Sequence, residues 1–219
     1  MGKGVAITGM GIISAIGNNV AENYDALINQ RKGITRVDNV ETIQRDEIMV
    51  GEVKFTNNEL IAQLNLPPEN NYSRTAMLGV IAAKEAIASA GITDIKKYKT
   101  GIVSGTSVGG MDMTEKYYYE YLTEKKFQKY IESHHAGDST QKIAEQLGIE
   151  QSLVTTISTA CSSAANAIML GARLIKSGRL DRVVVGGADC LSKFTINGFK
   201  TLMILSDTFN TPFDENRKG

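Results

Sequence analysis

Short β-branched segments that alternate with helix-like segments are the feature that most constrains the fold of this chain. Four of them are bounded by glycine or polar residues and are predicted to be buried strands: residues 5–8, 102–104, 154–158 and 183–185. Residues 48–54 form a weaker and more polar fifth segment, which we expect at a sheet edge. Strands that alternate with helices indicate an α/β domain with a mixed, mostly parallel five-stranded sheet and helices on both faces.

The segments between the strands carry apolar residues at helical spacing. This pattern predicts helices over residues 20–30, 73–90 and 139–147, and a glycine follows the last two. Residues 161–176 are small or apolar almost all round, which predicts a helix buried against neighbours on several sides. Residues 109–150 interrupt the alternation with three consecutive tyrosines and both histidines, so we expect a helical cap inserted here.

Composition excludes several classes of protein. The 219 residues include 24 Lys plus Arg and 24 Asp plus Glu, so the basic surplus typical of nucleic-acid binding is missing. Two cysteines cannot build a disulfide scaffold. The chain contains no run of 18 uncharged apolar residues that could cross a membrane. We therefore expect a folded cytoplasmic protein whose partners are neither nucleic acid nor membrane.

Two glycine motifs follow predicted strands. Residues 9–14 resemble a dinucleotide fingerprint, but Ser14 replaces the third glycine and no acidic residue follows at the required distance, so a tightly packed turn is the preferred interpretation. Residues 105–109 match G-x-S-x-G, which would make Ser107 the nucleophile of a serine hydrolase. Such a hydrolase also needs an acidic residue and a histidine further along the chain. The two histidines of this chain lie in the polar segment 109–150 and at no predicted strand end, so a glycine-rich loop that lines a pocket is the preferred interpretation.

A metal site is the least supported alternative. His134, His135 and Asp138 supply ligand types, but adjacent histidines on a regular helix cannot both face one ion. We therefore expect no metal site.

Cys161 is the strongest candidate for a catalytic residue. It follows the predicted strand 154–158 and opens the small-residue helix, where the helix dipole and free backbone N–H groups favour a thiolate and can hold an oxyanion. A buried structural role remains the alternative for a lone cysteine. Cys190 has no such setting, and we expect it to be structural.

A series of motifs in order resembles the elongating β-ketoacyl-acyl-carrier-protein synthases of the thiolase superfamily. The motifs are V-A-I-T-G-M-G-I-I-S-A-I-G at 5–17, S-R-T-A-M-L at 73–78, G-I-V-S-G-T-S-V-G-G at 101–110, T-A-C-S-S-A-A-N-A-I at 159–168, G-G-A-D at 186–189, G-F at 198–199 and P-F-D-E-N-R-K-G at 212–219. The resemblance spans the whole chain and implies the N-terminal half of a thiolase-like fold.

The resemblance also implies a reaction. Cys161 would accept an acyl group from acyl carrier protein as a thioester, and its N–H would supply half of an oxyanion hole. Val108 and Phe199 correspond to positions that line the acyl pocket. Residues 153–158 resemble the strand that pairs with its mate in a homodimer. No cofactor is implied for the enzyme itself, because the phosphopantetheine belongs to the carrier protein.

The chain departs from this family in one large respect. The family's two catalytic histidines, its active-site lysine and its glycine-rich gate belong to the second half of the fold, and neither His134 nor His135 matches one of them. We therefore expect a fragment that carries the nucleophile and needs the missing C-terminal half. Two other functions stay open: a non-catalytic chain-length subunit of a heterodimer, against which Cys161 argues, and the serine hydrolase that uses Ser107.

Overall fold

A three-stranded parallel sheet forms the centre of the computed structural model, which describes residues 4–149 and 152–218. The central strand β3 (Thr100–Gly105) lies between β4 (Val154–Ile157) and β5 (Arg182–Gly187). Val103 is in register with Thr155 on one side and with Val185 on the other. Because the strands are parallel, their carboxyl ends meet at one edge of the sheet, and this α/β arrangement confirms the predicted fold class.

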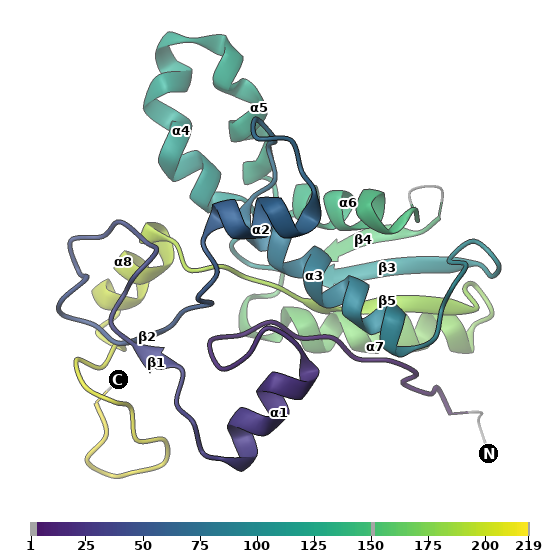
Figure 1. Cartoon of the computed structure of the whole chain (residues 1–219), viewed down its shortest axis with the longest axis horizontal. Helices are drawn as coiled ribbons and strands as arrows, with labels where there is room; N and C mark the ends of the chain where they lie inside the picture. Colours follow the sequence, from purple (N-terminus) through teal and green to yellow (C-terminus); the bar gives the residue numbers. More distant parts are fainter. Residues whose placement is uncertain (1–3, 150–151, 219) are drawn as a thin grey trace.

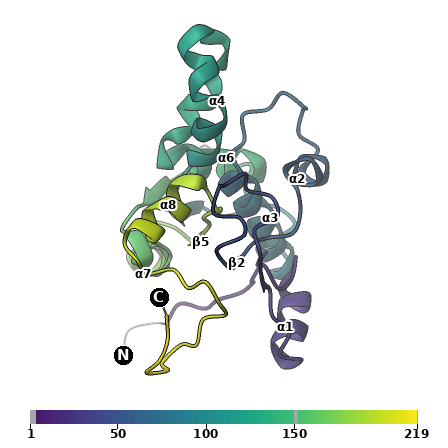
Figure 2. The same cartoon turned by 90° about the vertical axis from the view of Figure 1, so that its left-hand side faces the viewer.

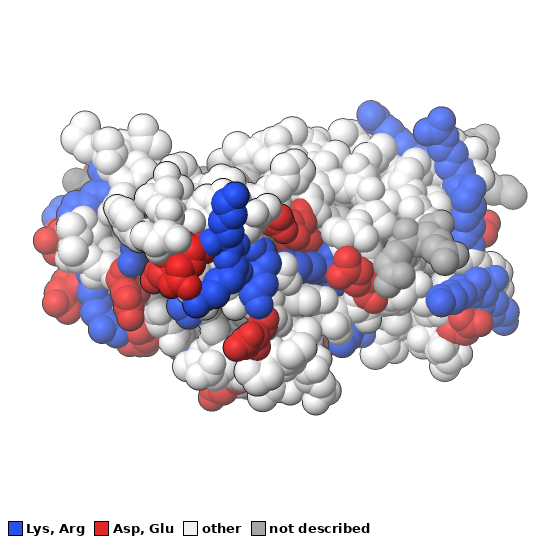
Figure 3. Space-filling model, turned by 90° about the horizontal axis from the view of Figure 1, so that it is seen from above, with Lys and Arg blue, Asp and Glu red and all other residues white. Residues whose placement is uncertain are grey.

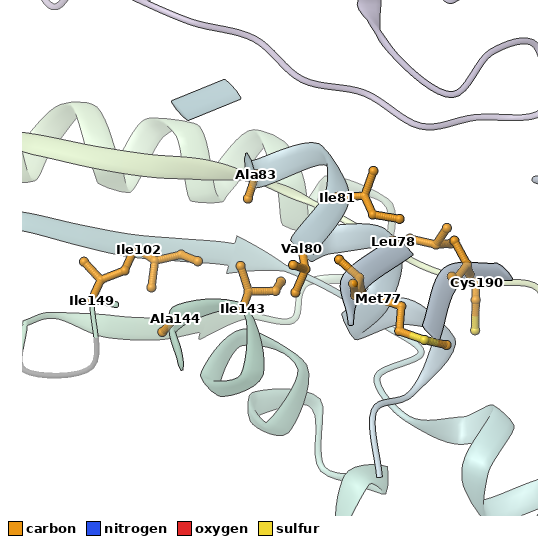
Figure 4. Packing of buried hydrophobic residues seen from close by; sticks show 12 residues of the cluster. Met77, Leu78, Val80, Ile81, Ala83, Ile102, Ile143, Ala144, Ile149 and Cys190 are labelled. Atoms are coloured by element: carbon orange, nitrogen blue, oxygen red, sulfur yellow. The ribbon is translucent and has the colours of Figure 1, made fainter. Parts of the chain in front are cut away.

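Helices cover both faces of the sheet, as predicted. The helices α3 (Arg74–Ser89) and α6 (Ala136–Leu147) pack on one face, and α7 (Ser163–Lys176) packs on the other (Figure 1). Successive side chains of β3 point to opposite faces of the sheet, so this strand contributes to the hydrophobic core on both faces. The side chain of Ile102 joins the cluster of α3 and α6, which includes Met77, Val80 and Ile143 (Figure 4), whereas Val103 joins the cluster of α7, with Ala167 and Leu174.

Side-chain caps fix the helix ends close to the predicted positions. The Ser73 hydroxyl accepts a hydrogen bond from the Ala76 N–H at the start of α3. Helix α1 (Val20–Ile28) begins in the same way after Asn19. Helix α6 begins three residues earlier than predicted, because the His135 ring accepts from the Gly137 N–H, and it ends at Gly148 in the left-handed conformation.

The remaining helices lie outside the sheet layers. The structure has α2 (Asn57–Leu64), α4 (Met111–Thr123), α5 (Gln128–Ile131), α8 (Lys193–Thr201) and the 3₁₀ turns Lys125–Phe127, Glu132–His134 and Ala160–Ser162. Helices α4 and α5 project from the body (Figures 1 and 2), and the Tyr117 ring, whose centroid lies 4.1 Å from that of Tyr130, joins them. Within the predicted cap, α6 instead packs against α3 and β4.

The strand predicted at residues 5–8 is wrong. No strand is assigned there, and Ile7 is 82% exposed. The segment that follows packs along α3 instead: the Ile12 N–H donates to the Glu85 carboxylate, and a Cβ on Gly11 would lie 2.0 Å from the Ala82 carbonyl oxygen. Side chains of a helix, rather than a neighbouring strand, therefore satisfy part of this backbone.

The five-stranded count also needs correction. Of residues 48–54, only β2 (Val50–Gly51) pairs, in an antiparallel ladder with β1 (Ile34–Thr35), and this ladder is separate from the main sheet. Within the described residues the main sheet has three strands. The Glu52 carboxylate explains the departure from a regular strand, because it turns toward the N–H groups of Asp38 and Asn39 and closes a loop.

Helix α7 is buried on one face only, contrary to prediction. A Cβ on Gly171 would lie 2.3 Å from a Val185 methyl, so this face lies directly on β5. On the opposite face Met169 is 44% exposed. The composition predicted neighbours on several sides, and the described part of the chain supplies them on one.

Basic and acidic side chains are interspersed on the surface (Figure 3), in line with their equal numbers in the sequence. Lys or Arg and Asp or Glu adjoin one another in the middle of the face shown in Figure 3. Among the described residues, no helix has the length and apolar character that a membrane span requires.

Candidate functional site

The turn that carries Cys161 is in an unusual backbone conformation. It connects β4 to α7, and Ala160, the residue before Cys161, has a φ of 51°. This left-handed region is costly for any residue with a Cβ, by about 1–2 kcal/mol. The prediction that Cys161 opens a helix needs one refinement: Cys161 lies in a 3₁₀ turn, and the α-helix begins two residues later at Ser163. Its side chain is exposed.

Ser163 holds this turn from the helix side. Its hydroxyl donates to the Ala160 carbonyl oxygen at 2.7 Å and accepts from the Thr159 N–H at 2.9 Å. Ser163 is itself buried because β3 lies directly beneath it: a Cβ on Gly105 would lie 2.6 Å from the Ser163 carbonyl carbon. The close approach of β3 to the start of α7 therefore fixes the position of the Cys161 turn relative to the carboxyl end of β3.

The loop after β3 approaches the same turn from the other side. The Ser107 hydroxyl donates to the Ala160 carbonyl oxygen at 3.2 Å and lies 3.4 Å from the Ser163 hydroxyl. The Asp189 carboxylate, just beyond β5, accepts hydrogen bonds from the N–H groups of Ser107 and Val108, each at 3.0 Å. Three neighbouring strands thus deliver one connected set of polar contacts around Cys161.

An apolar cavity of about 440 Å³ opens beside the thiol. Val108, Cys161 and Phe199 all line it, together with Leu78, Cys190 and Ser107. Phe199 comes from α8, whose first N–H groups, those of Lys193 and Phe194, donate to the Glu115 carboxylate of α4. The structure therefore brings together the three predicted site residues, and the cavity has the apolar character that an acyl chain requires.

The two thiols of this cavity have different environments. Cys190 is buried at one end of the α3 cluster (Figure 4), and burial, assisted by the negative charge of Asp112, raises the pKa of its thiol to about 12. Cys190 therefore stays protonated at neutral pH, as expected of a structural cysteine. Cys161 is the exposed thiol of the pair.

Neither histidine reaches the cavity. The His134 ring is 3.0 Å from the Thr114 hydroxyl, and His135 caps α6. Ser107 bonds to Ala160 and Ser163, so its hydroxyl has no histidine base, and the geometry disfavours the serine hydrolase alternative. Among the described residues, no group of three or more His, Cys, Asp or Glu side chains could hold a metal ion.

Asp189 ends the G-G-A-D motif, but local sequence patterns assign no role to its side chain. The available signal was an acidic residue four positions beyond the predicted strand 183–185, at the sheet edge where the neighbouring strand is followed by a glycine loop. Which N–H groups it binds depends on the pairing of β3 with β5, which local patterns do not specify.

The structural comparisons agree with this geometry. The ishigamide ketosynthase/chain length factor superposes with a TM-score of 0.90 at 26% identity, covering 100% of this chain and 55% of that chain. A ketosynthase in complex with its chain length factor from Xenorhabdus doucetiae gives 0.81 at 27% identity, covering 99% and 55%. The fold is therefore that of the thiolase-like ketosynthases.

The sequence comparisons identify the family. Residues 3–219 match the sequence model described as "Beta-ketoacyl synthase, N-terminal domain", and the chain belongs to this family of condensing enzymes. It is 26% identical to 3-oxoacyl-[acyl-carrier-protein] synthase 2 of Staphylococcus aureus and 29% identical to nodulation protein E of Rhizobium meliloti. The matches cover 99% and 100% of this chain but 54% and 55% of those proteins, so the chain spans about half the length of the curated relatives it matches.

Proposed function

We propose that Cys161 accepts an acyl group from acyl carrier protein and presents it for chain elongation. The observation that carries this proposal is the exposed thiol on a strained turn, at the mouth of an apolar cavity that Val108 and Phe199 line. A thiolate there attacks the acyl thioester of the carrier, and the phosphopantetheine thiol of the carrier leaves. Covalent storage on Cys161 divides one difficult condensation into two easier steps.

The second step completes a decarboxylative Claisen condensation. Malonyl carrier protein loses carbon dioxide, and its enolate carbon attacks the thioester carbonyl of acyl-Cys161. The resulting tetrahedral oxyanion would be held in part by the Cys161 N–H. Collapse forms 3-oxoacyl carrier protein and releases the Cys161 thiolate. Val108 and Phe199 act as substrate-binding residues that shape the acyl tunnel.

Decarboxylation of the malonyl unit needs polar groups beside the cavity, and neither histidine of this chain is placed to supply them. His134 and His135 bond within the cap and at the start of α6, away from the cavity. We propose that a second half of the fold supplies them, in line with the fraction of each relative that this chain covers. Enolate stabilisation by preorganised groups is worth a factor of about 100 to 1,000 for each group.

We also propose a dimer through β4. Among the residues that the structure describes, this strand is at one edge of the three-stranded sheet, so its outer N–H and C=O groups face away from β3, where a second copy could pair with them. The comparisons favour one variation: two similar structures are ketosynthases associated with chain length factors. A chain-length partner subunit is therefore the second candidate, and the exposed Cys161 thiol argues for the catalytic one.

Release of carbon dioxide tests the division of labour between the halves. We expect chain 1–219, supplied with acyl and malonyl carrier proteins, to release none above background. Sustained turnover by this chain alone would contradict the proposed need for a second half, and it would assign His134 or His135 a role that their contacts do not support.

A further inference from the structure

Asp189 accepts several hydrogen bonds on the side of the site that faces away from α7. Its carboxylate accepts from the Thr106 hydroxyl and from two consecutive N–H groups, those of Ser107 and Val108. Thr106 is 1% exposed, and its hydroxyl also accepts from the Gly109 N–H at 3.0 Å. One carboxylate thus fixes the backbone of the whole turn that follows β3.

The strand pairing explains why Asp189 reaches this turn. Gly105, the last residue of β3, is in register with Gly187, the last residue of β5. The Ala188 N–H donates to the Gly105 carbonyl oxygen at 3.1 Å and continues the ladder by one residue. The next side chain, Asp189, is therefore placed beside residues 106–108.

The fixed turn acts on the Cys161 backbone through one hydroxyl. Ser107 donates to the carbonyl oxygen of Ala160, the residue held at a φ of 51°. A strained conformation of this kind persists only where its surroundings over-determine it. Ser163 supplies one such contact from α7, and Ser107 supplies another from the loop.

We propose that Asp189 is a positioning residue for Cys161. It orients residues 106–108 so that Ser107 can hold the Ala160 carbonyl, and this contact sets the direction of the Cys161 thiol and N–H. Asp189 has no role of its own in bond making. The proposal rests on the proposed function for its biological purpose, but its test concerns only the reactivity of the thiol.

Two opposing effects make the test diagnostic. Asp189→Asn removes a negative charge from the neighbourhood of the thiol, and this change alone favours the thiolate and speeds alkylation. Loss of orientation slows alkylation, because a neutral amide oxygen binds the Ser107 and Val108 N–H groups more weakly than a carboxylate does. The second carboxylate oxygen, 3.2 Å from the Ser107 nitrogen, also becomes an NH₂ group that cannot accept. Slower alkylation of Cys161 in Asp189→Asn therefore identifies positioning rather than charge.

The experiment measures iodoacetamide alkylation of Cys161 in chain 1–219 across a pH series. We expect Asp189→Asn and Ser107→Ala each to slow alkylation at neutral pH, where a larger thiolate fraction would speed it, by about fivefold, the effect of one net hydrogen bond. The double variant should be no slower than Asp189→Asn, because Asp189 acts through Ser107. The Ala160 ¹³C chemical shifts should leave the left-handed range in both single variants.

Asp181→Asn is the matched control. Asp181 lies just before β5 at the opposite end of the strand, and it accepts from the Lys99 N–H at 3.0 Å, so it has a similar structural role far from the site. We expect the Cys161 alkylation rate of this variant to match that of the parent chain.

Several results would overturn the proposal. Unchanged or faster alkylation in Asp189→Asn, or additive slowing in the double variant, would show that Asp189 does not act through Ser107. If Asp189→Asn does not fold, Ser107→Ala alone decides, because it removes one exposed hydroxyl: an unchanged rate and an unchanged Ala160 shift refute the proposed contact. Failure of acyl transfer to Cys161, by contrast, would refute the proposed function and leave these rates untouched.

Discussion

Replacing Gly105 with alanine should destabilise the junction between β3 and α7. The added Cβ would lie 2.6 Å from the Ser163 carbonyl carbon and 2.7 Å from the Ala164 nitrogen, both backbone atoms at the start of the helix. Overpacking of this kind costs about 1–3 kcal/mol, and replacing a strand glycine returns about 0.5–1 kcal/mol. Because the clashing atoms belong to the backbone and cannot move aside cheaply, the upper half of the overpacking range applies, about 2–3 kcal/mol. The net loss in the free energy of unfolding is therefore about 1–2.5 kcal/mol, or roughly 2 to 10 °C in Tm for a chain of this size.

Gly186→Ala provides a matched control one strand away. Gly186 also lies in a parallel strand of the same sheet, but no heavy atom lies within 4 Å of its added Cβ. Thermal unfolding followed by circular dichroism should show an unchanged or slightly raised Tm for Gly186→Ala and a lowered Tm for Gly105→Ala. Equal Tm values for the two variants would refute the close approach of α7 to β3, and with it the placement of the Cys161 turn.

Two further predictions concern the cysteines. Brief labelling with iodoacetamide followed by peptide mapping should modify Cys161 before Cys190, because Cys161 is exposed and burial raises the pKa of Cys190 to about 12; equal labelling in the folded state would contradict this. The raised pKa of Cys190 also links stability to pH: the contribution of its neutral thiol is complete below about pH 9 and is lost as the pH rises toward 12. Urea unfolding should show the stability advantage of the parent chain over Cys190→Ala narrowing by about 1.4 kcal/mol between about pH 8 and about pH 10, and a constant difference would argue that Cys190 is not buried.

Local patterns predicted the helices better than the pairing of the strands. Helical periodicity and capping residues placed α3 and α1 to within two residues, because both signals reside in the helix itself. Residues 5–8 have the composition of a buried strand, but a strand also needs a partner, and here the backbone that follows bonds to α3 side chains. Pairing is a property of the whole chain, so composition alone could not reveal this difference.

The residues of the candidate site could be predicted from the sequence, but the contacts that hold them in place could not. Cys161 could be selected as the candidate nucleophile from its place after a strand and before a helix of small residues, and the family resemblance supplied Val108 and Phe199 as candidate pocket residues. The positive φ of Ala160 and the contacts of Asp189 and Ser107 depend on residues that are 53 and 82 positions apart in the sequence. Only the folded sheet brings these groups together.

Acyl transfer to the thiol is the most direct test of the account. Chain 1–219 is mixed with acyl carrier protein that bears a fatty acyl thioester, and peptide mass spectrometry locates any acyl group, with Cys161→Ala as the control. We predict one acyl group on the peptide that contains Cys161 and none on this peptide in the variant. An acyl group on Ser107 or Cys190, or no acylation of a folded chain whose Cys161 reacts readily with iodoacetamide, would contradict the assignment of Cys161 as the acyl acceptor.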